Sequence, residues 1–153
     1  MTQFQQISLL LLRVSLGWYF FWAGITKVLD PSWSAAGFLN HASMFPGFYA
    51  WFARPEILPL VNFLNAWGLT LIGVALILGL FVRLSAVFGV LLMMLYYFAN
   101  TSEFSFIVDD HVTISFALFV LASFRAGRVW GLENWCIRLP FCATYPRLRD
   151  LLG

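Results

Sequence analysis

The chain has 153 residues, of which 61% are hydrophobic and 10% are charged, and its formal net charge is +2 at pH 7. Soluble globular domains carry roughly 25% charged residues, so this composition excludes an ordinary soluble enzyme or binding domain. We expect a lipid bilayer around the chain and no nucleic-acid partner.

Four long apolar runs fill most of the sequence. They cover approximately residues 7–28, 57–82, 84–101 and 110–126. A helix needs about 18 residues or more to cross a hydrocarbon core roughly 30 Å thick, and every run is near or above that length. We therefore predict an all-α integral membrane protein, a four-transmembrane-helix antiparallel bundle that forms a single domain over residues 1–153.

The arginines predict the orientation of this bundle. Arg83 lies in the short connection between the second and third runs, and the arginines that follow the fourth run are Arg125, Arg128, Arg138, Arg147 and Arg149. Positively charged residues are enriched in cytoplasmic loops, so we expect both termini on the cytoplasmic side of the cell membrane. Arg13 interrupts the first run and no small-residue cleavage site follows, so this run is expected to be retained as a span.

Two aromatic-rich segments are expected at the membrane surfaces. The outer segment, residues 28–56, predicts a short interfacial helix at about 35–43 that covers the outer mouth of the bundle. The segment at 128–138 predicts an amphipathic strip on the inner surface. We interpret both segments mainly as anchors.

One face of the first run carries both of its cations. Arg13, Gly17, Phe20, Gly24 and Lys27 follow each other at spacings of four, three, four and three residues, which places them on one helical stripe. The glycines allow another helix to approach closely, so both cations are expected to face the bundle interior. For Arg13, the alternative is that its side chain reaches along the helix to the inner surface.

A polar group is expected at the outer end of the bundle, where alternating helices bring several side chains to one depth. Its members are Lys27, Asn62, Asn65, Trp67, Tyr96, Tyr97, Asn100, Asp109, Asp110, His111, Thr113 and Ser115. We expect Lys27 to pair with Asp109 or Asp110, the nearest carboxylates. A cation, carboxylates, one imidazole and aromatic rings suit a redox or proton-coupled site. Helix capping and an aromatic belt are the alternative interpretation.

Metal binding is not expected. The chain has two histidines, His41 and His111, and two cysteines, Cys136 and Cys142, that are predicted on the opposite side of the membrane. The cysteines should stay reduced in the cytoplasm and have no further zinc ligands near them.

Several motifs in this order resemble the DoxX/DoxD family of small four-span membrane proteins, over roughly residues 10–135. They are Arg13 in the first span, Gly24-x-x-Lys27, Gly79-Leu-x-x-Arg83, the Asp110-His111 opening of the fourth span and its Ala126-Gly127-Arg128 close. The Trp67-Gly68 pair and the Asp-His pair are similar to the DoxD-like branch. That branch provides the membrane subunit of a thiosulfate:quinone oxidoreductase.

The resemblance implies a two-electron transfer from a small sulfur oxyanion to a membrane quinone, without a bound metal and with a possible second subunit. Lys27 would polarise the quinone or attract the anion, His111 would exchange protons, and Asp110 would orient His111. The residues that would bind the quinone are Arg13, Asn65, Trp67, Tyr96, Tyr97 and Ser115. Two alternatives remain open: a non-catalytic anchor or assembly subunit of an oxidoreductase, and a small-solute transporter.

Overall fold

The computed structural model describes residues 1–100 and 108–136, and this part of the chain is helical without any strand. In chain order the elements are α1 (Gln3–Leu29), α2 (Ala36–Asn40), α3 (Pro46–Phe52), α4 (Leu58–Leu78), α5 (Val82–Asn100), α6 (Asp110–Ser123), the 3₁₀ turn η1 (Ala126–Arg128) and α7 (Glu133–Cys136). The all-α prediction is therefore confirmed for the described residues. Arg138, Cys142, Arg147 and Arg149 lie outside them.

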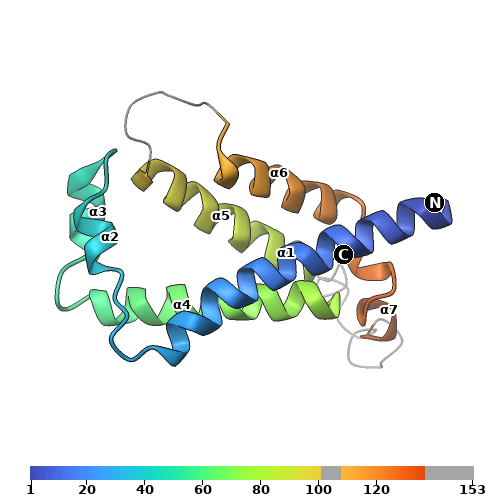
Figure 1. Cartoon of the computed structure of the whole chain (residues 1–153), viewed down its shortest axis with the longest axis horizontal. Helices are drawn as coiled ribbons and strands as arrows, with labels where there is room; N and C mark the ends of the chain where they lie inside the picture. The colour runs from blue at the N-terminus through green and yellow to red at the C-terminus, as the bar shows by residue number, and fades with distance from the viewer. Residues whose placement is uncertain (101–107, 137–153) are drawn as a thin grey trace.

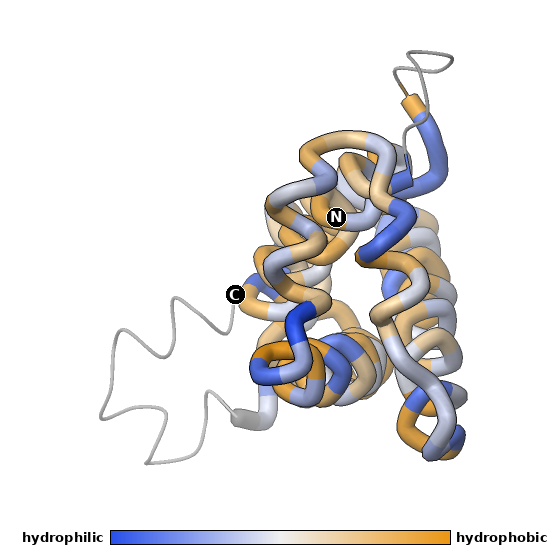
Figure 2. Tube along the Cα trace, turned by 90° about the vertical axis from the view of Figure 1, so that its left-hand side faces the viewer, coloured by the Kyte–Doolittle hydropathy of each residue, from blue (hydrophilic) through white to orange (hydrophobic). Residues whose placement is uncertain are grey.

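Within the described residues, three helices are long and apolar enough to cross a membrane. They are α1 with 27 residues, α4 with 21 and α5 with 19. The fourth predicted run forms the shorter helix α6 of 14 residues, which at 1.5 Å per residue extends about 21 Å. Apolar residues, orange in Figure 2, run along the helices, and strongly hydrophilic ones are confined to short stretches.

The long helices lie in two closely packed pairs. Helix α1 lies along α4, and α5 lies along α6 (Figure 1). The end of α1, the start of α4 and the end of α5 meet on the side of α2 and α3, whereas the N-terminus and α7 lie on the opposite side. The side of α2 and α3 corresponds to the predicted outer end, and the side of α7 to the predicted inner end.

Glycines on the predicted stripe bring α1 and α4 together. A Cβ added to Gly17 would lie 2.8 Å from Ile77 Cγ1, and one added to Gly24 would meet the backbone of Thr70 and Ala66. Distances this short leave no room for a side chain, so the two backbones touch only because Cβ is missing. The prediction that this stripe faces the bundle interior is confirmed.

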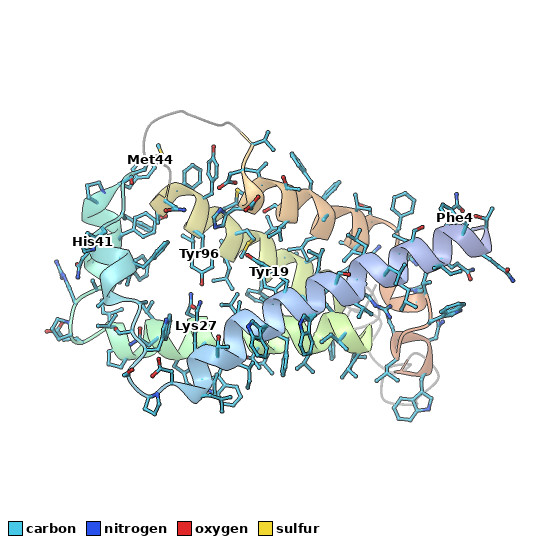
Figure 3. All side chains as sticks on the ribbon, in the orientation of Figure 1. Phe4, Tyr19, Lys27, His41, Met44 and Tyr96 are labelled. Carbon is cyan, nitrogen blue, oxygen red and sulfur yellow. The ribbon has the colours of Figure 1, made fainter. Side chains whose placement is uncertain are left out.

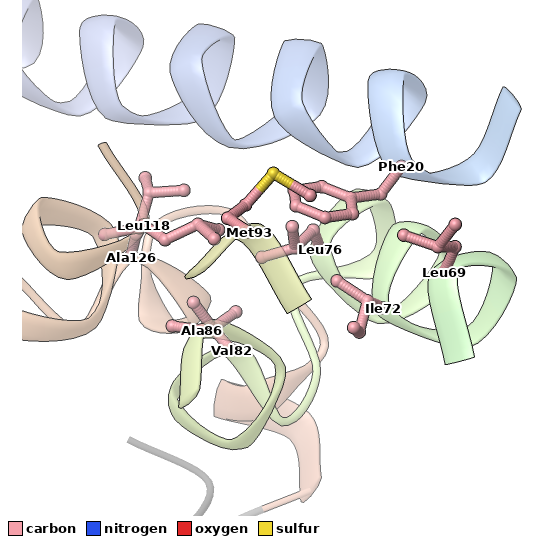
Figure 4. Close-up of a cluster of buried hydrophobic side chains, with 10 residues drawn as sticks. Phe20, Leu69, Ile72, Leu76, Val82, Ala86, Met93, Leu118 and Ala126 are labelled. Atoms are coloured by element: carbon pink, nitrogen blue, oxygen red, sulfur yellow. The ribbon is translucent and has the colours of Figure 1, made fainter. Parts of the chain in front are cut away.

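A single apolar core fills the space between the two helix pairs (Figure 4). Its buried members are Phe20, Leu69, Ile72, Leu76, Val82, Ala86, Met93, Leu118, Leu121 and Ala126. Phe20 stands midway between Arg13 and Lys27 on the stripe, so this core separates the two cations of α1.

The outer segment is folded rather than only an aromatic anchor. Helix α2 forms within the predicted range of 35–43, and α3 was not expected. The segment is tied to the long helices at three points: Ala35 N donates to Asn62 Oδ1 at 2.9 Å, Ser43 N to Ala99 O at 2.8 Å, and the Tyr49 hydroxyl to Leu95 O at 2.7 Å. These bonds hold α2 and α3 over the ends of α4 and α5.

The C-terminal strip is also attached to the bundle. Leu132 N donates to Leu78 O at 3.0 Å and Glu133 N donates to Gly79 O at 3.1 Å. Gly79 ends α4 with φ +65, a left-handed conformation that glycine adopts without strain. The strip therefore completes the end of α4 by donating hydrogen bonds to its last carbonyl groups. Residues 137–138 of the predicted strip lie outside the described part.

Candidate functional site

A cavity of about 500 Å³ lies beneath α2 and α3, between the ends of α1, α4 and α5. Ligand pockets in proteins measure roughly 300–1,000 Å³, so this cavity is large enough for a small organic molecule. Its walls are mostly apolar and aromatic. The outer segment contributes Trp33, Phe38, Leu39, Phe48 and Phe52, and the long helices contribute Val61, Leu64, Leu92 and Leu95.

Three polar side chains line the same cavity and contact each other; we call Lys27, Asn65 and Tyr96 the polar trio. Lys27 Nζ donates to Asn65 Oδ1 at 3.0 Å and to the Tyr96 hydroxyl oxygen at 3.4 Å. Asn65 Nδ2 donates to the same hydroxyl oxygen. Figure 3 shows Lys27 and Tyr96 directed toward each other from α1 and α5. The trio thus joins three long helices.

Lys27 is the only lysine of the chain, and aromatic rings surround its ammonium group. Nζ lies 5.0 Å from the ring centre of Trp33 and 5.6 Å from that of Tyr96, distances at which a cation is attracted to the ring face. The expected ion pair of Lys27 with Asp109 or Asp110 is wrong: its partners are the neutral groups of Asn65 and Tyr96. Among the described residues, no carboxylate lines the cavity.

Asp109 and His111 form a second polar pair directly behind Tyr96. His111 Nδ1 lies 2.6 Å from Asp109 Oδ2, and the His111 ring lies edge-on to the Tyr96 ring with centres 6.1 Å apart. Asp109 also caps α6 by accepting from Val112 N at 3.0 Å. Partial burial opposes ionisation of Asp109, but the hydrogen bonds from His111 and Val112 outweigh it and hold the pKa of Asp109 below its usual value.

The other predicted site residues at this end do not line the cavity. Asp110 is exposed at the start of α6, and Trp67 is exposed on α4, where it packs on Phe63. Tyr97 packs on Phe98. Ser115 is buried, and its hydroxyl donates to His111 O at 2.7 Å within α6. The carboxylate that orients His111 is therefore Asp109 and not Asp110.

Arg13 lies at the opposite end of the stripe and cannot act on a ligand in this cavity. Its side chain is 1% exposed, and its guanidinium donates to the carbonyls of Ala126, Val129 at 2.9 Å and Trp130 at 3.5 Å. These carbonyls belong to the turn after α6. Arg13 faces the interior as predicted.

Sequence reasoning missed a buried carboxyl group near Arg13. The Glu133 side chain is 0% exposed, and its Oε1 accepts from Arg128 Nε at 3.4 Å. Burial raises the pKa of Glu133 to about 7, even though Arg128 opposes that rise. The signal in the sequence was a single acid within the strip from Trp130 to Trp135, which is rich in aromatic residues.

The aromatic cavity wall was also missed, because the aromatics of residues 28–56 were interpreted as a membrane-interface belt. Pro31, Pro46 and Pro55 interrupt this segment, and prolines at these intervals were the available signal that the segment folds back on the bundle. Aromatic side chains that only lie at a membrane interface do not require such turns.

A protein-family model described as DoxX matches residues 8–101. The matched range includes most of α1 and all of α4 and α5, and with them the whole polar trio. Neither the comparison with curated proteins nor the comparison with solved structures gave a match.

Proposed function

The chain belongs to the DoxX family, and from this premise we propose that it is the membrane subunit of a thiosulfate:quinone oxidoreductase-like system, with the quinone ring bound in the cavity beneath α2 and α3. In this proposal the fold is a four-span antiparallel bundle in the cytoplasmic membrane, with both termini inside the cell and the cavity near the outer face.

The observation that carries the proposal is the ammonium group of Lys27 in a cavity whose walls are mostly apolar and aromatic. An apolar body with a polarisable carbonyl group matches both parts of this site: the rings and aliphatic side chains contact the body, and Lys27 Nζ donates to the carbonyl oxygen. Negative charge that develops on that oxygen during reduction would be stabilised by the cation in a medium of low dielectric constant.

The proposed reaction balances without a resident redox group in the described residues. Oxidation of two thiosulfate ions to tetrathionate releases two electrons, and one quinone takes up these electrons and two protons to form the quinol. His111, oriented by Asp109 and in contact with the Tyr96 ring, is the proposed exchange group for protons. A second subunit is the proposed site of thiosulfate oxidation.

The transporter alternative is disfavoured by the apolar core. A path from the polar trio to Arg13 would have to cross the buried cluster around Phe20, Leu76 and Leu118, each of which is 0% exposed. The anchor or assembly alternative needs the same bundle but no ligand in the cavity, and the experiment below decides between it and the proposal.

We predict that replacement of the cavity cation abolishes quinone-linked activity. Lys27→Met keeps the length and apolar stem of the side chain, and it should reduce thiosulfate-dependent quinone reduction in membranes by about ten-fold or more, the usual scale for loss of a charge-stabilising group. Purified wild-type protein should carry quinone in a lipid extract, and Lys27→Met should carry less.

Arg54→Met is the matched control. Arg54 is an exposed cation of the same outer segment and does not line the cavity, so this variant should keep wild-type activity and quinone content. Equal activity in both variants, with no quinone in the wild-type extract, would favour the assembly-subunit interpretation.

A further inference from the structure

The polar trio contains more hydrogen-bond donors than acceptors. The Lys27 ammonium has three N–H groups and uses two of them, on Asn65 Oδ1 and on the Tyr96 hydroxyl oxygen. The Asn65 amide has two N–H groups and uses one, on the same hydroxyl oxygen. The two oxygens of the trio therefore already accept every bond that is formed inside it.

The hydroxyl proton of Tyr96 has no acceptor within the trio. The Lys27 ammonium can only donate hydrogen bonds. The Asn65 amide must therefore present its oxygen, Oδ1, to Lys27 and its nitrogen, Nδ2, to Tyr96. The Tyr96 oxygen then receives donors from two directions, and its own proton points away from both. Within residues 1–100 and 108–136, the Tyr96 hydroxyl makes no hydrogen bond outside the trio.

The other polar side chains that line the cavity are Trp33, Ser34 and Tyr49, and within the described residues none of them accepts a hydrogen bond from Lys27. The Tyr49 hydroxyl, on α3, donates its proton to Leu95 O, the Ser34 hydroxyl oxygen already accepts from Ala36 N and Asn62 Nδ2, and the indole of Trp33 is a donor only. The Asp109–His111 pair lies behind the Tyr96 ring and does not line the cavity. A molecule that enters the cavity is therefore met at Lys27 by free N–H and O–H groups.

We propose that the polar trio selects the ligand of this cavity by its redox state, binding a head group that only accepts hydrogen bonds and rejecting one that must donate. This inference rests on the proposed function. An oxidised quinone presents a carbonyl oxygen, which accepts from Lys27 and from the Tyr96 hydroxyl. A quinol presents an O–H group at the same place, and its proton then faces the donor groups of the trio without an acceptor among them, which costs binding free energy.

A difference in affinity of this kind favours turnover from quinone to quinol. The oxidised quinone binds in the cavity, and the quinol that forms is bound less tightly and dissociates. Tyr96 and Asn65 are then specificity-determining residues, because they decide which form of the carrier is retained.

The test is the ratio of two dissociation constants, measured by anaerobic equilibrium binding of decylubiquinone and decylubiquinol to the whole purified protein in lipid nanodiscs. Wild-type protein should bind the quinone at least about ten-fold more tightly than the quinol. This ratio is in the lower part of the range expected when one hydrogen-bond donor is left without an acceptor. Asn65→Asp replaces amide donors by carboxylate acceptors at nearly unchanged volume, so it should reduce the ratio to about three-fold or less, or invert it.

Asn62→Asp is the matched control, one turn earlier on α4. Asn62 Oδ1 accepts from Ala35 N and the residue does not line the cavity, so the same change there should keep the wild-type ratio. Tyr96→Phe removes the free O–H donor and should weaken quinone binding several-fold while changing quinol binding less.

Equal binding of the two forms by the wild-type protein would overturn the inference and leave the proposed quinone site standing. An unchanged ratio in both Asn65→Asp and Tyr96→Phe would also overturn it, because the trio would then not be the source of selection. Binding of neither form by the wild-type protein would overturn the proposed function itself.

Discussion

At the scale of single residues, the two cations of α1 are stabilised in different ways. Arg13 is enclosed by protein: its two terminal nitrogens donate to backbone carbonyls of the turn after α6, and the buried carboxyl group of Glu133 interacts with its charge. Lys27 lies at a cavity and has two neutral partners. Arg13 is not among the residues that line this cavity, whereas the trio around Lys27 has hydrogen-bond donors that a ligand can use.

Glu133 is the residue whose protonation should govern the stability of the inner end. Its pKa is raised from an ordinary value of 4.5 to about 7 by burial, so the folded state holds this proton more tightly than the unfolded state does. Stability is therefore highest below about pH 4.5 with respect to this group and is lost as pH rises toward 7. The loss is at most about 3 to 4 kcal/mol, since one pKa unit corresponds to about 1.4 kcal/mol.

We predict that Glu133→Gln removes this part of the pH dependence. Thermal unfolding of detergent-solubilised protein between pH 5 and pH 8 should show a smaller decrease of Tm for the variant than for the wild type. Glu56→Gln makes the same chemical change at an exposed position and should follow the wild type. If Glu133→Gln lost as much stability with rising pH as the wild type, the buried carboxyl group would not be the titrating group.

At the scale of elements, the contact of α1 with α4 depends on missing Cβ atoms. Gly24 lies against the backbone of Thr70 and Ala66, and Gly73 lies against the backbone of Phe21. Backbone cannot move aside as a flexible side chain can, so a methyl group at these positions has to separate the helices. The same contact positions Lys27, one turn beyond Gly24, next to Asn65 on α4.

We predict that Gly24→Ala destabilises the protein by about 1–3 kcal/mol, the usual cost of overpacking, and also loosens the polar trio. Gly68→Ala is the matched control on α4, where no atom lies within 4 Å of an added Cβ, and it should be neutral or slightly stabilising because alanine favours helix. Unfolding in increasing sodium dodecyl sulfate measures both variants. Equal stability of the two would contradict the close packing of α1 and α4.

At the scale of the whole molecule, the two polar clusters lie at opposite ends of an apolar core. The trio lies on the side of α2 and α3, and Arg13 with Glu133 lies on the side of α7 (Figure 1). Since Arg83 at the start of α5 and the arginines of the turn after α6 are on the α7 side, that side is the proposed cytoplasmic face. The cavity then opens near the outer leaflet.

We predict this orientation for labelling of intact cells. In a background with both native cysteines replaced by alanine, a membrane-impermeant maleimide should modify Ser43→Cys, in the exposed outer segment. It should modify Gln3→Cys, at the exposed start of α1, only after the cells are permeabilised. Labelling of Gln3→Cys in intact cells would show that the N-terminus is outside.

Composition and residue spacing alone predict the helical class, the bounds of the long helices to within a few residues, the interior stripe from Arg13 to Lys27, and a helix over the outer mouth of the bundle. These features are local, because apolar length and a repeat of three and four residues act within one helix. The tertiary structure was needed to identify the partners, which are Asn65 and Tyr96 for Lys27 and Asp109 for His111, and to show that aromatic side chains of the outer segment form the wall of a cavity. Partners depend on how each helix is rotated and which helix it lies beside, and the close pairing of α1 with α4 brings Asn65, rather than a carboxylate of α6, within reach of Lys27.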